Sequence, residues 1–373
     1  RQGKKIHHPT LEYQTGSIRN DFDFGQLLLF RNDSFQQVVA QMNTDYRFAA
    51  LYELRLSISR LGKIVHIPET LYTVQPTDLR LSGEKQFDYV DPANREVQLE
   101  MEAVCTAHLQ AIGAWLAPEF QRIDFGQENF AREASVIIPV RNRKRTIAEA
   151  VESALQQQTD FSFNVIVVDN HSTDSTGQIL TELSRRYPNL IHHIPASTEL
   201  GIGGCWTEAI LLPECGKFAI QLDSDDLYKD CHVLQRIVDT FYQENCAMVI
   251  GSYQMVDFKL EEIPPGLIAH REWTPDNGRN NALRINGLGA PRAFYTPVLR
   301  QIKFPNVSYG EDYATALAIS RKYPIARIYD PLYLCRRWEE NSDHDLDIQQ
   351  LNNYNFYKDK IRTLEIQARI SGK

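Results

Sequence analysis

The sequence predicts an α/β protein built around a mostly parallel, Rossmann-like sheet flanked by helices. From Glu133 onward, short apolar runs alternate with segments of helical periodicity, which is typical of successive βαβ units. One apolar run, residues 217–222, leads directly into the acidic segment Asp223-Ser-Asp-Asp226. Such groups are expected outside the carboxyl ends of strands, where open α/β sheets bind ligands. With 373 residues, 43% of them hydrophobic, the chain is long enough for two domains with buried cores.

Four strands and three helices are expected in the order β-α-β-α-β-α-β. The first helix begins near Ile147, where apolar side chains recur at the i, i+3, i+4 spacing of an amphipathic helix. The second helix carries Ile179 and Leu183, and Ser172 or Asp174 is expected to cap it. The third helix follows the glycine-rich turn at residues 201–204. The expected strands are residues 135–139, 163–168, 190–194 and 217–222.

Residues 1–125 are expected to form an N-terminal module, followed by a domain at residues 126–373 that ends in a helical tail. A helix is expected at residues 97–116 and a linker at 113–126. The segment from Asp45 to Tyr72 resembles the segment from Asp312 to Tyr333, because each has the pattern of a helix, a strand and an L-Y exit. This likeness predicts a partial internal repeat within residues 17–80, unless two helix–strand units are alike by chance.

Composition narrows the functional classes. The formal net charge of −8 disfavours a general affinity for nucleic acid or anionic membranes, although it allows a local basic pocket. The six cysteines contain no C-x-x-C pair, which predicts reduced thiols in a cytoplasmic protein. No apolar run approaches the roughly 18 residues of a membrane span, so any membrane association is expected to be peripheral and through the acceptor.

The acidic segment predicts a metal site. In an extended chain, Asp223 and Asp225 would share one side, roughly 7 Å apart at about 3.3 Å per residue, and Asp226 would point away. Two carboxylates at the end of a strand suit Mg²⁺ or Mn²⁺, which keeps coordination positions open for substrate phosphates. The alternative is that Asp226 caps a following helix. An EF-hand is excluded because Leu227 and Tyr228 stand where an oxygen ligand and a glycine are needed.

Polar residues also follow the first two strands. Arg141 and Asn142 follow the first strand, and Asp169 and Asn170 end the second. Since parallel strands end at one edge of a sheet, these residues are expected to form a nucleotide crevice with the acidic segment. Asn142 and Asp169 would contact the edge of a base, and Arg141 would face phosphate. Taken singly, each residue would equally suit a turn.

Four segments together resemble the successive motifs of the family 2 glycosyltransferases, which are inverting enzymes with the GT-A fold. They are ASVIIPVRNRKRTIAEAVESALQQQ, VIVVDNHSTDSTGQIL, FAIQLDSDD and SYGEDYATAL. The resemblance covers about residues 133–345. It implies a GT-A domain there, and it makes the N-terminal module similar to the acceptor-side half of a truncated second domain.

The resemblance also implies roles for individual residues. The implied nucleotide-sugar-binding residues are Pro139, Arg141, Asn142, Asp169, Asn170, Asp223, Ser224 and Asp225. Asp223 and Asp225 would hold the ribose and the metal-bound diphosphate, with His344 as a further metal ligand. Asp312 would be the catalytic base, and Glu311 would orient it or bind acceptor hydroxyls. The alternative is that both acids only cap the helix expected at residues 313–321.

Two departures from the family pattern leave the donor sugar open. The family often has asparagine where Glu199 stands, and an arginine-asparagine pair near Trp206 and Thr207. The late aromatic-histidine segment of the family is present only loosely, as CRRWEENSDH.

The resulting interpretation is a metal-dependent inverting glycosyltransferase. It would use Mn²⁺ or Mg²⁺, a nucleotide-sugar donor such as a UDP-sugar, and a hydroxyl of a glycan or lipid-linked acceptor. A sugar nucleotidyltransferase is the first alternative, disfavoured because no glycine-rich basic loop follows the first strand. A non-catalytic carbohydrate-binding relative is the second, suggested by the departures at Glu199 and Thr207.

Overall fold

The computed structural model describes residues 7–43, 45–74, 94–126, 128–338 and 346–372. The chain divides into two units, each assembled from separate parts of the sequence. Unit 1 consists of Arg1–Ala117, Glu272–Asn286 and Asp343–Lys373. Unit 2 consists of Pro118–Arg271 and Gly287–Ser342. The domain division expected at residue 125 stays a prediction. Here unit 2 begins at Pro118, and the last helix of the chain groups with unit 1.

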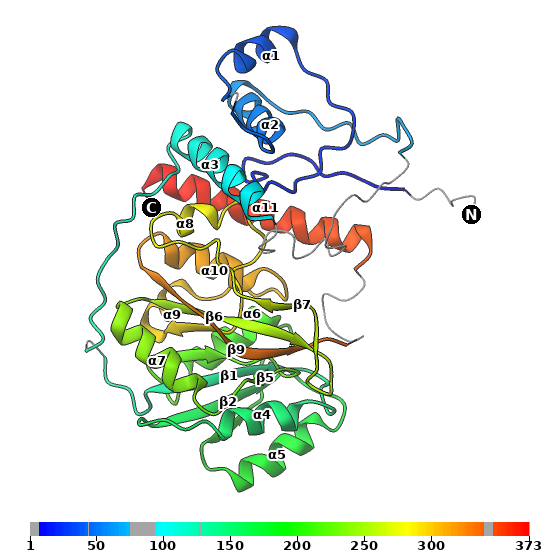
Figure 1. The fold of residues 1–373 in the computed structure, drawn as a ribbon. Helices are drawn as coiled ribbons and strands as arrows, with labels where there is room; N and C mark the ends of the chain where they lie inside the picture. The colour runs from blue at the N-terminus through cyan, green and yellow to red at the C-terminus, as the bar shows by residue number, and fades with distance from the viewer. Residues whose placement is uncertain (1–6, 44, 75–93, 127, 339–345, 373) are drawn as a thin grey trace. The chain divides into compact units, whose positions relative to one another are not determined.

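Among the described residues, unit 2 forms a nine-stranded sheet with the order β3-β2-β1-β4-β8-β6-β9-β5, and β7 lies beside β6 (Figure 1). The strands are β1 Ala134–Val140, β2 Phe163–Asp169, β3 Leu190–His193, β4 Phe218–Gln221, β5 Leu227–Tyr228, β6 Met248–Val256, β7 Glu262–Ile268, β8 Arg292–Tyr295 and β9 Ile325–Arg336. Strands β3, β2, β1 and β4 are parallel neighbours, and β9 is parallel to β6. Strand β8 lies between β4 and β6 and runs antiparallel to both of them.

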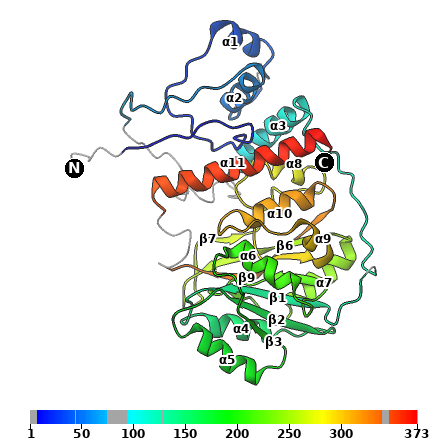
Figure 2. The ribbon, with the colours of Figure 1, turned by 180° about the vertical axis from the view of Figure 1, so that it is seen from behind.

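Helices cover both faces of this sheet (Figure 2). They are α4 Ile147–Leu155, α5 Thr176–Arg186, α6 Ile202–Leu211, α7 Val233–Glu244, α9 Thr296–Ile302 and α10 Glu311–Ser320. Phe241 of α7 stacks on Phe218, whereas Trp206 of α6 packs against Phe294. Phe294 of β8 is paired with Ala219 of β4, the residue after Phe218. Because successive side chains of a strand alternate sides, Phe218 and Phe294 face opposite sides of the sheet. Helices α4, α5 and α7 therefore cover one face, and α6, α9 and α10 cover the other.

The covered faces explain why the central strands are apolar at nearly every position. Six of the seven residues of β1 are buried, and so are six of the seven of β2. A parallel sheet with helices on both faces has no solvated side, so its strands do not alternate between apolar and polar residues. The expected α/β fold is therefore confirmed, although the described sheet is mixed, with four parallel and four antiparallel strand pairs. All four predicted strands lie within one residue of β1, β2, β3 and β4 at each end.

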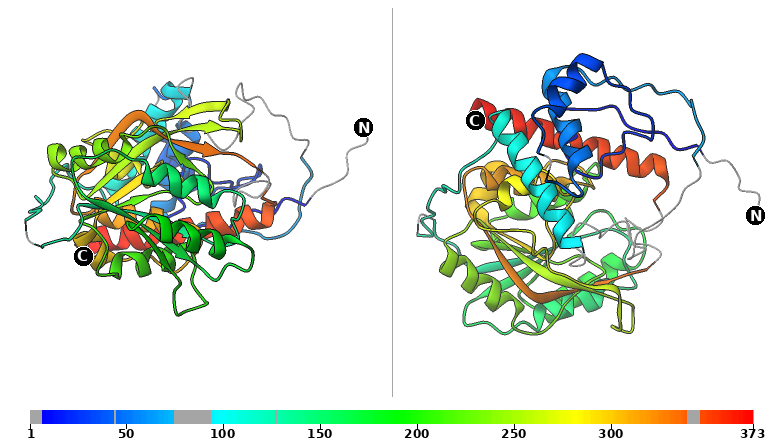
Figure 3. Two further views of the ribbon diagram at one scale, coloured as in Figure 1. Left: turned by 90° about the horizontal axis from the view of Figure 1, so that it is seen from below. Right: turned by 45° about the horizontal axis from the view of Figure 1, so that its top comes forward.

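Unit 1 contains helices and no strand among its described residues. The helices are α1 Asn32–Val39, α2 Ala50–Leu61, α3 Arg95–Ala111, α8 Gly278–Asn281 and α11 Ile348–Ser371. Helix α11, orange to red in Figure 3, begins with a capping box in which Asp347 accepts from Gln350 N and Gln350 reaches back to the backbone of Asp347.

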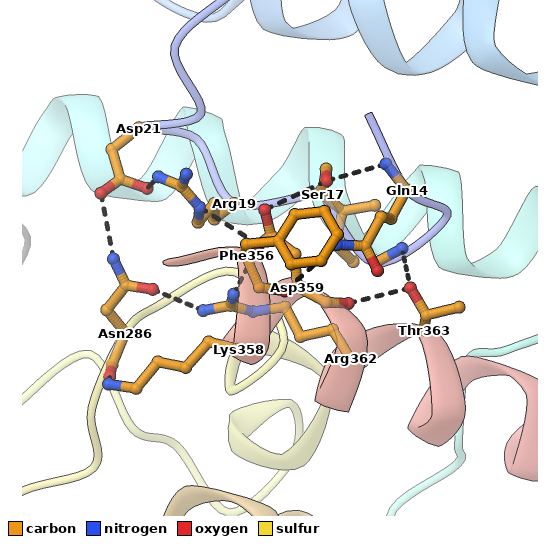
Figure 4. A network of polar contacts seen from close by, with 12 residues as sticks. Gln14, Ser17, Arg19, Asp21, Asn286, Phe356, Lys358, Asp359, Arg362 and Thr363 are labelled. Carbon is orange, nitrogen blue, oxygen red and sulfur yellow. Dashed lines mark hydrogen bonds and ion pairs between the residues drawn. The ribbon is translucent and has the colours of Figure 1, made fainter. Parts of the chain in front are cut away.

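Asp359 of α11 is the centre of a buried polar network that joins the first and last parts of unit 1 (Figure 4). Its carboxylate accepts from Ser17 Oγ at 3.1 Å, from Arg19 Nε at 3.2 Å and from Arg362 Nη1 at 2.9 Å. Gly16 lies against the same helix so closely that a Cβ atom there would meet Asp359 O at 2.1 Å. The N-terminal segment is thus fastened directly to the backbone and side chains of α11.

The predicted internal repeat stays a prediction. Helix α2 begins at Ala50, five residues after Asp45, whereas α10 begins at Glu311, directly before Asp312. The segment after α2 contains no strand among its described residues, so it has no counterpart of β9. The likeness is limited to the two helices, α2 and α10. Thr44, which would correspond to Glu311, lies outside the described residues.

Candidate active site

The carboxyl ends of three neighbouring strands place most of the predicted site residues at one edge of the unit 2 sheet. Strand β1 lies between β2 and β4, with Val140 opposite Asp169 and Ile137 opposite Gln221. The antiparallel strand β8 brings its first residue, Arg292, to the same edge, next to Gln221. The chain therefore gathers groups there from segments that are far apart in sequence.

The acidic segment forms a turn, which corrects the expectation of an extended chain. Strand β4 ends at Gln221, and Asp226 N donates to Asp223 O at 3.2 Å to close the turn. The spacing of roughly 7 Å expected for Asp223 and Asp225 therefore does not apply, because it assumed that the strand continued. Asp226 does not cap α7, whose N-cap residue is His232. Instead, its Oδ1 accepts from Arg336 N of β9 at 2.8 Å.

Gln221 connects the acidic turn to β8. Its Nε2 donates to both carboxylate oxygens of Asp223, at 2.9 and 3.1 Å. Its Oε1 accepts from Arg292 N at 3.1 Å and from Arg292 Nη1 at 3.2 Å. Burial raises the pKa of Asp223, as does the neighbouring charge of Asp225, whereas the Gln221 hydrogen bonds oppose that rise. A buried amide thus orients one carboxylate and one guanidinium at the same time.

Arg292 pairs with the predicted catalytic base. Its Nη2 lies 2.6 Å from Oδ2 of Asp312, and both side chains are about one-fifth exposed, at 20% and 23%. Burial lowers the pKa of Arg292, but the charges of Asp312 and Asp223 more than offset this, and the net shift is upward. The pair joins α10 to the strand beside the acidic turn.

Glu311 has a different environment from Asp312. Burial raises its pKa to about 8, and the charge of Asp312 adds to that rise. Its Oε2 atom is buried without a hydrogen-bond partner. At neutral pH Glu311 is therefore mostly a protonated acid that can donate a hydrogen bond, while its neighbour is ion-paired.

Glycines position this acid pair. Gly310 has φ +78°, a left-handed conformation that only glycine adopts without strain, and it is the N-cap of α10. Gly203 of α6 lies against the segment before α10, where a Cβ atom would meet Pro305 O at 2.0 Å. Gly203 N also donates to Val307 O at 2.9 Å. The glycine-rich turn therefore allows close packing of α6 on the segment that leads into Glu311.

Asp169 lies at an open cavity of about 500 Å³. The lining comes from the end of β2, from α5 and from β3, and includes Ser172, Asp174, Gln178, Arg185 and His192. Burial opposes ionisation of Asp169, but hydrogen bonds from His192 and Ser172 lower its pKa overall. The lining includes neither Asp223 nor Asp225. The described lining of this cavity is therefore separate from the acidic turn.

The remaining nucleotide-binding candidates have mixed environments. Asn142 has φ 54°, and its Oδ1 accepts from Thr173 N at 2.7 Å, so its acceptor atom supports a turn. Asn170 donates to Leu200 O at 2.8 Å, and its Oδ1 is buried without a hydrogen-bond partner. Arg141 is exposed, Pro139 is half-buried at the end of β1, and Ser224 is buried within the acidic turn.

The donor set fits a hard divalent cation only in part. Asp223 and Asp225 offer carboxylate oxygens, but the described residues contain no group of three or more His, Cys, Asp or Glu side chains that could hold a metal. Mg²⁺ and Mn²⁺ commonly bind through one or two carboxylates plus substrate phosphates. The residues therefore fit a cation that is held jointly with a diphosphate. His344 lies outside the described residues.

The sheet order, the acidic turn after β4 and the acid pair at the start of α10 define unit 2 as a domain of the GT-A fold. Residues 135–302 match the family model described as glycosyl transferase family 2. The recognition made from the four motifs is confirmed.

Two curated relatives and one solved structure illustrate the similarity. The poly(ribitol-phosphate) beta-glucosyltransferase of Bacillus spizizenii is 25% identical over 230 residues, which cover 60% of this chain and 35% of that protein. An uncharacterized glycosyltransferase of Nostoc is 32% identical over 123 residues, covering 33% of this chain and 37% of that protein. The chain thus spans little more than a third of these relatives' lengths. The crystal structure of Staphylococcus aureus TarS residues 1–349 with UDP-GlcNAc has a TM-score of 0.48 and 23% identity, covering 64% of this chain and 72% of that chain.

Sequence reasoning assigned no role to several residues that contact the predicted acids or the acidic turn, and four of them matter most for the site. They are Gln221, Arg292, Arg336 and Trp338. Gln221 precedes the acidic turn and was visible as a polar residue in an apolar run. Arg336 and Trp338 lie in the segment CRRWEENSDH, which resembled a late family segment but carried no assignment for these two residues. No local pattern indicates that Arg292 of β8 reaches the turn.

Proposed function

We propose that the protein transfers a sugar from a nucleoside diphosphate sugar, a UDP-sugar by preference, to a hydroxyl group of a glycan or lipid-linked acceptor. The observation that carries the proposal is the shared edge at which Asp223 and Asp225 lie beside the Arg292–Asp312 pair. A donor diphosphate at the acidic turn would place its sugar toward α10. The glycosyltransferase relatives support the reaction class.

The donor would be bound at two places. Asp169 would accept a hydrogen bond from N3 of uracil at the cavity beside α5. Asp223 and Asp225 would hold Mn²⁺ or Mg²⁺ with the diphosphate, and the cation would neutralise charge on the leaving group. Burial is the main cause of the raised pKa of Asp223, and repulsion from Asp225 adds to it, so a bound cation would offset that repulsion.

The chain's own residues would then carry the proton transfer. Asp312 would accept the proton of the acceptor hydroxyl while that oxygen forms a bond to the anomeric carbon. The bond from the anomeric carbon to the phosphate oxygen breaks, and UDP leaves with the electron pair. Glu311, protonated at neutral pH, would donate a hydrogen bond to a sugar or acceptor oxygen. A single displacement of this kind inverts the anomeric configuration.

The test is a panel of nucleotide sugars, each incubated with Mn²⁺ and assayed for release of the nucleoside diphosphate. Asp312→Asn keeps the shape of the side chain but removes its basicity, so transfer should fall on the order of 10²-fold or more while UDP binding persists. Near wild-type transfer by this variant, or a product with retained configuration, would contradict the assignment of the base.

The same assay separates the alternatives. Release of pyrophosphate from UTP and a sugar phosphate would favour a nucleotidyltransferase. Binding of UDP without any turnover of the whole panel would favour a non-catalytic relative.

A further inference from the structure

The end of β9 is fastened to the acidic turn at three points. Arg336 N donates to Asp226 Oδ1 at 2.8 Å, and Arg336 Nε donates to the backbone oxygen of Asp225. Two residues later, Trp338 Nε1 donates to Asp225 Oδ2 at 3.0 Å. Of these contacts, the last one acts on the carboxylate that would bind the cation.

Two arginine side chains from the segment between β1 and α4 lie over the Trp338 ring. The guanidinium carbon of Arg145 lies 5.3 Å from the ring centroid, and that of Arg143 lies 5.7 Å from it. Phe258 packs edge-on against the indole at 5.4 Å and carries Arg145 at 4.5 Å. Tryptophan is the aromatic side chain that binds cations most strongly through its face.

Arg143 also approaches the acidic turn itself. Its Nε lies 3.9 Å from Asp225 Oδ2, the same oxygen that accepts from Trp338. Asp225 is only 13% exposed and Arg143 24% exposed, so solvent screens this pair incompletely. One indole therefore contacts the carboxylate, the guanidinium paired with it and a second guanidinium beside it.

We propose that Trp338 is a positioning residue for the donor diphosphate and its cation, an inference that rests on the proposed function. Its N–H fixes Asp225 so that the carboxylate presents its remaining lone pairs to the cation. Its ring faces hold Arg143 and Arg145 where they bind the phosphate oxygens of the same diphosphate. Packing accounts for the ring contacts, and the N–H bond to Asp225 is the contact that connects the indole to the candidate cation ligand.

The test compares Trp338→Phe, which keeps a ring face but removes the N–H, with Trp338→Leu, which removes both. The binding of Mn²⁺ in the presence of saturating UDP is measured from the electron paramagnetic resonance signal of the free ion. Trp338→Phe should weaken Mn²⁺ binding about 10-fold, in line with the 10-fold to 100-fold effect of removing outer contacts to metal ligands. Trp115→Phe, a change at a half-buried tryptophan of unit 1, is the matched control and should leave Mn²⁺ binding unchanged.

A second measurement isolates the arginines. UDP affinity is measured by calorimetry in EDTA, where no cation contributes. Trp338→Leu and Arg143→Gln should each weaken UDP binding several-fold, whereas Trp338→Phe and the control Lys144→Gln, an exposed cation of the same segment, should not. Thermal unfolding of each variant shows that it is folded.

The outcomes separate this inference from the proposed function. If the wild-type protein binds neither UDP nor Mn²⁺ with UDP, both proposals are wrong. If it binds both, and Trp338→Phe retains Mn²⁺ affinity within twofold of the wild type, only the positioning role of Trp338 is overturned. A matching loss in Trp115→Phe would also overturn it, because the effect would then not be local.

Discussion

Arg292 Nη2 and Asp312 Oδ2 lie 2.6 Å apart, and Nη1 of the same arginine donates to Oε1 of Gln221, which orients it. The predicted base is therefore held by a residue that is itself fixed to the acidic turn. This chain of contacts gives the first prediction.

Replacing Arg292 by glutamine should reduce transfer about 10- to 100-fold, because a base displaced by about 1 Å can cost 10²-fold in rate. UDP affinity should change far less, so the loss should lie in kcat. Arg292→Lys should restore part of the rate, since lysine keeps the charge but lacks the planar fork. Steady-state kinetics with a varied donor concentration make the measurement.

The matched control is Arg236→Gln. Arg236 forms an ion pair of equal length, 2.6 Å, with Asp230, but both side chains are more than one-third exposed. Exposed pairs contribute about 0 to 1 kcal/mol, so this variant should keep its rate and most of its stability. Equal losses of activity in the two variants would show that Arg292 has no special role.

Cation binding should depend on the nucleotide. With two carboxylates as the described protein ligands, Mn²⁺ alone should bind weakly, and UDP should strengthen its binding by at least 10-fold, as calorimetry can show. Asp225→Asn should abolish this gain. Asp230→Asn, a change at an exposed acid of the same region, should not. Tight binding of Mn²⁺ without UDP would mean that further ligands complete the site.

Glu311 should make stability depend on pH. Its pKa in the folded protein is about 8, against 4.5 for an ordinary glutamate, mainly because of burial. Between these values the folded chain retains a proton that the unfolded chain has lost, so stability falls as pH rises from about 4.5 to about 8. Glu311→Gln removes this loss, and its Tm advantage over the wild type should grow across that window by several °C.

Differential scanning fluorimetry from pH 5 to pH 9 measures this difference. The control is Glu244→Gln, a change at an exposed glutamate at the end of α7, which should give a small and nearly constant shift. A Tm difference for Glu311→Gln that does not grow with pH would show that the carboxyl group ionises normally.

Asp169 should determine which nucleobase of the donor binds. UDP should bind more tightly than GDP or ADP, because a carboxylate accepts the N3 hydrogen of uracil and the pocket is expected to fit one ring. Asp169→Ala should weaken UDP binding about 10-fold, the effect of losing one charge-assisted hydrogen bond of about 1.5 kcal/mol. Glu182→Gln, a change in the same cavity lining, should have little effect. Competition binding with the three diphosphates would contradict the assignment if GDP bound best.

Local patterns were enough to predict the first half of unit 2. Helix α4 begins at Ile147 as its apolar spacing predicts. The expected cap of α5 was wrong, because its N-cap is Ser175 without a side-chain cap bond, although Asp174 Oδ1 accepts from Thr176 N next to it. These signals depend on neighbours in sequence. The four motifs also predicted the family whose model matches residues 135–302, since together they are far more specific than any one of them.

The rest of the site depends on contacts that no local pattern encodes. The turn at Asp223 replaced the expected extended strand because its backbone and carboxylates bond to Tyr333, Arg336 and Trp338. These three residues lie about 110 positions later in the chain. Likewise, the pairing of Arg292 with Asp312 follows from the direction of β8, which is set by its neighbours β4 and β6.

The network around Asp359 has a consequence for how the chain folds during synthesis. Ser17 and Asp359 are separated by 342 residues, although their side chains bond directly. Ser17 and Arg19 therefore leave the ribosome long before α11, and their buried side chains lack the Asp359 carboxylate until α11 emerges. Unit 2 is encoded between Arg19 and α11 and can acquire its sheet earlier, since domains generally fold as units during translation. The segment that contains Ser17 and Arg19 should thus become protease-resistant later than unit 2, although it is synthesised before it.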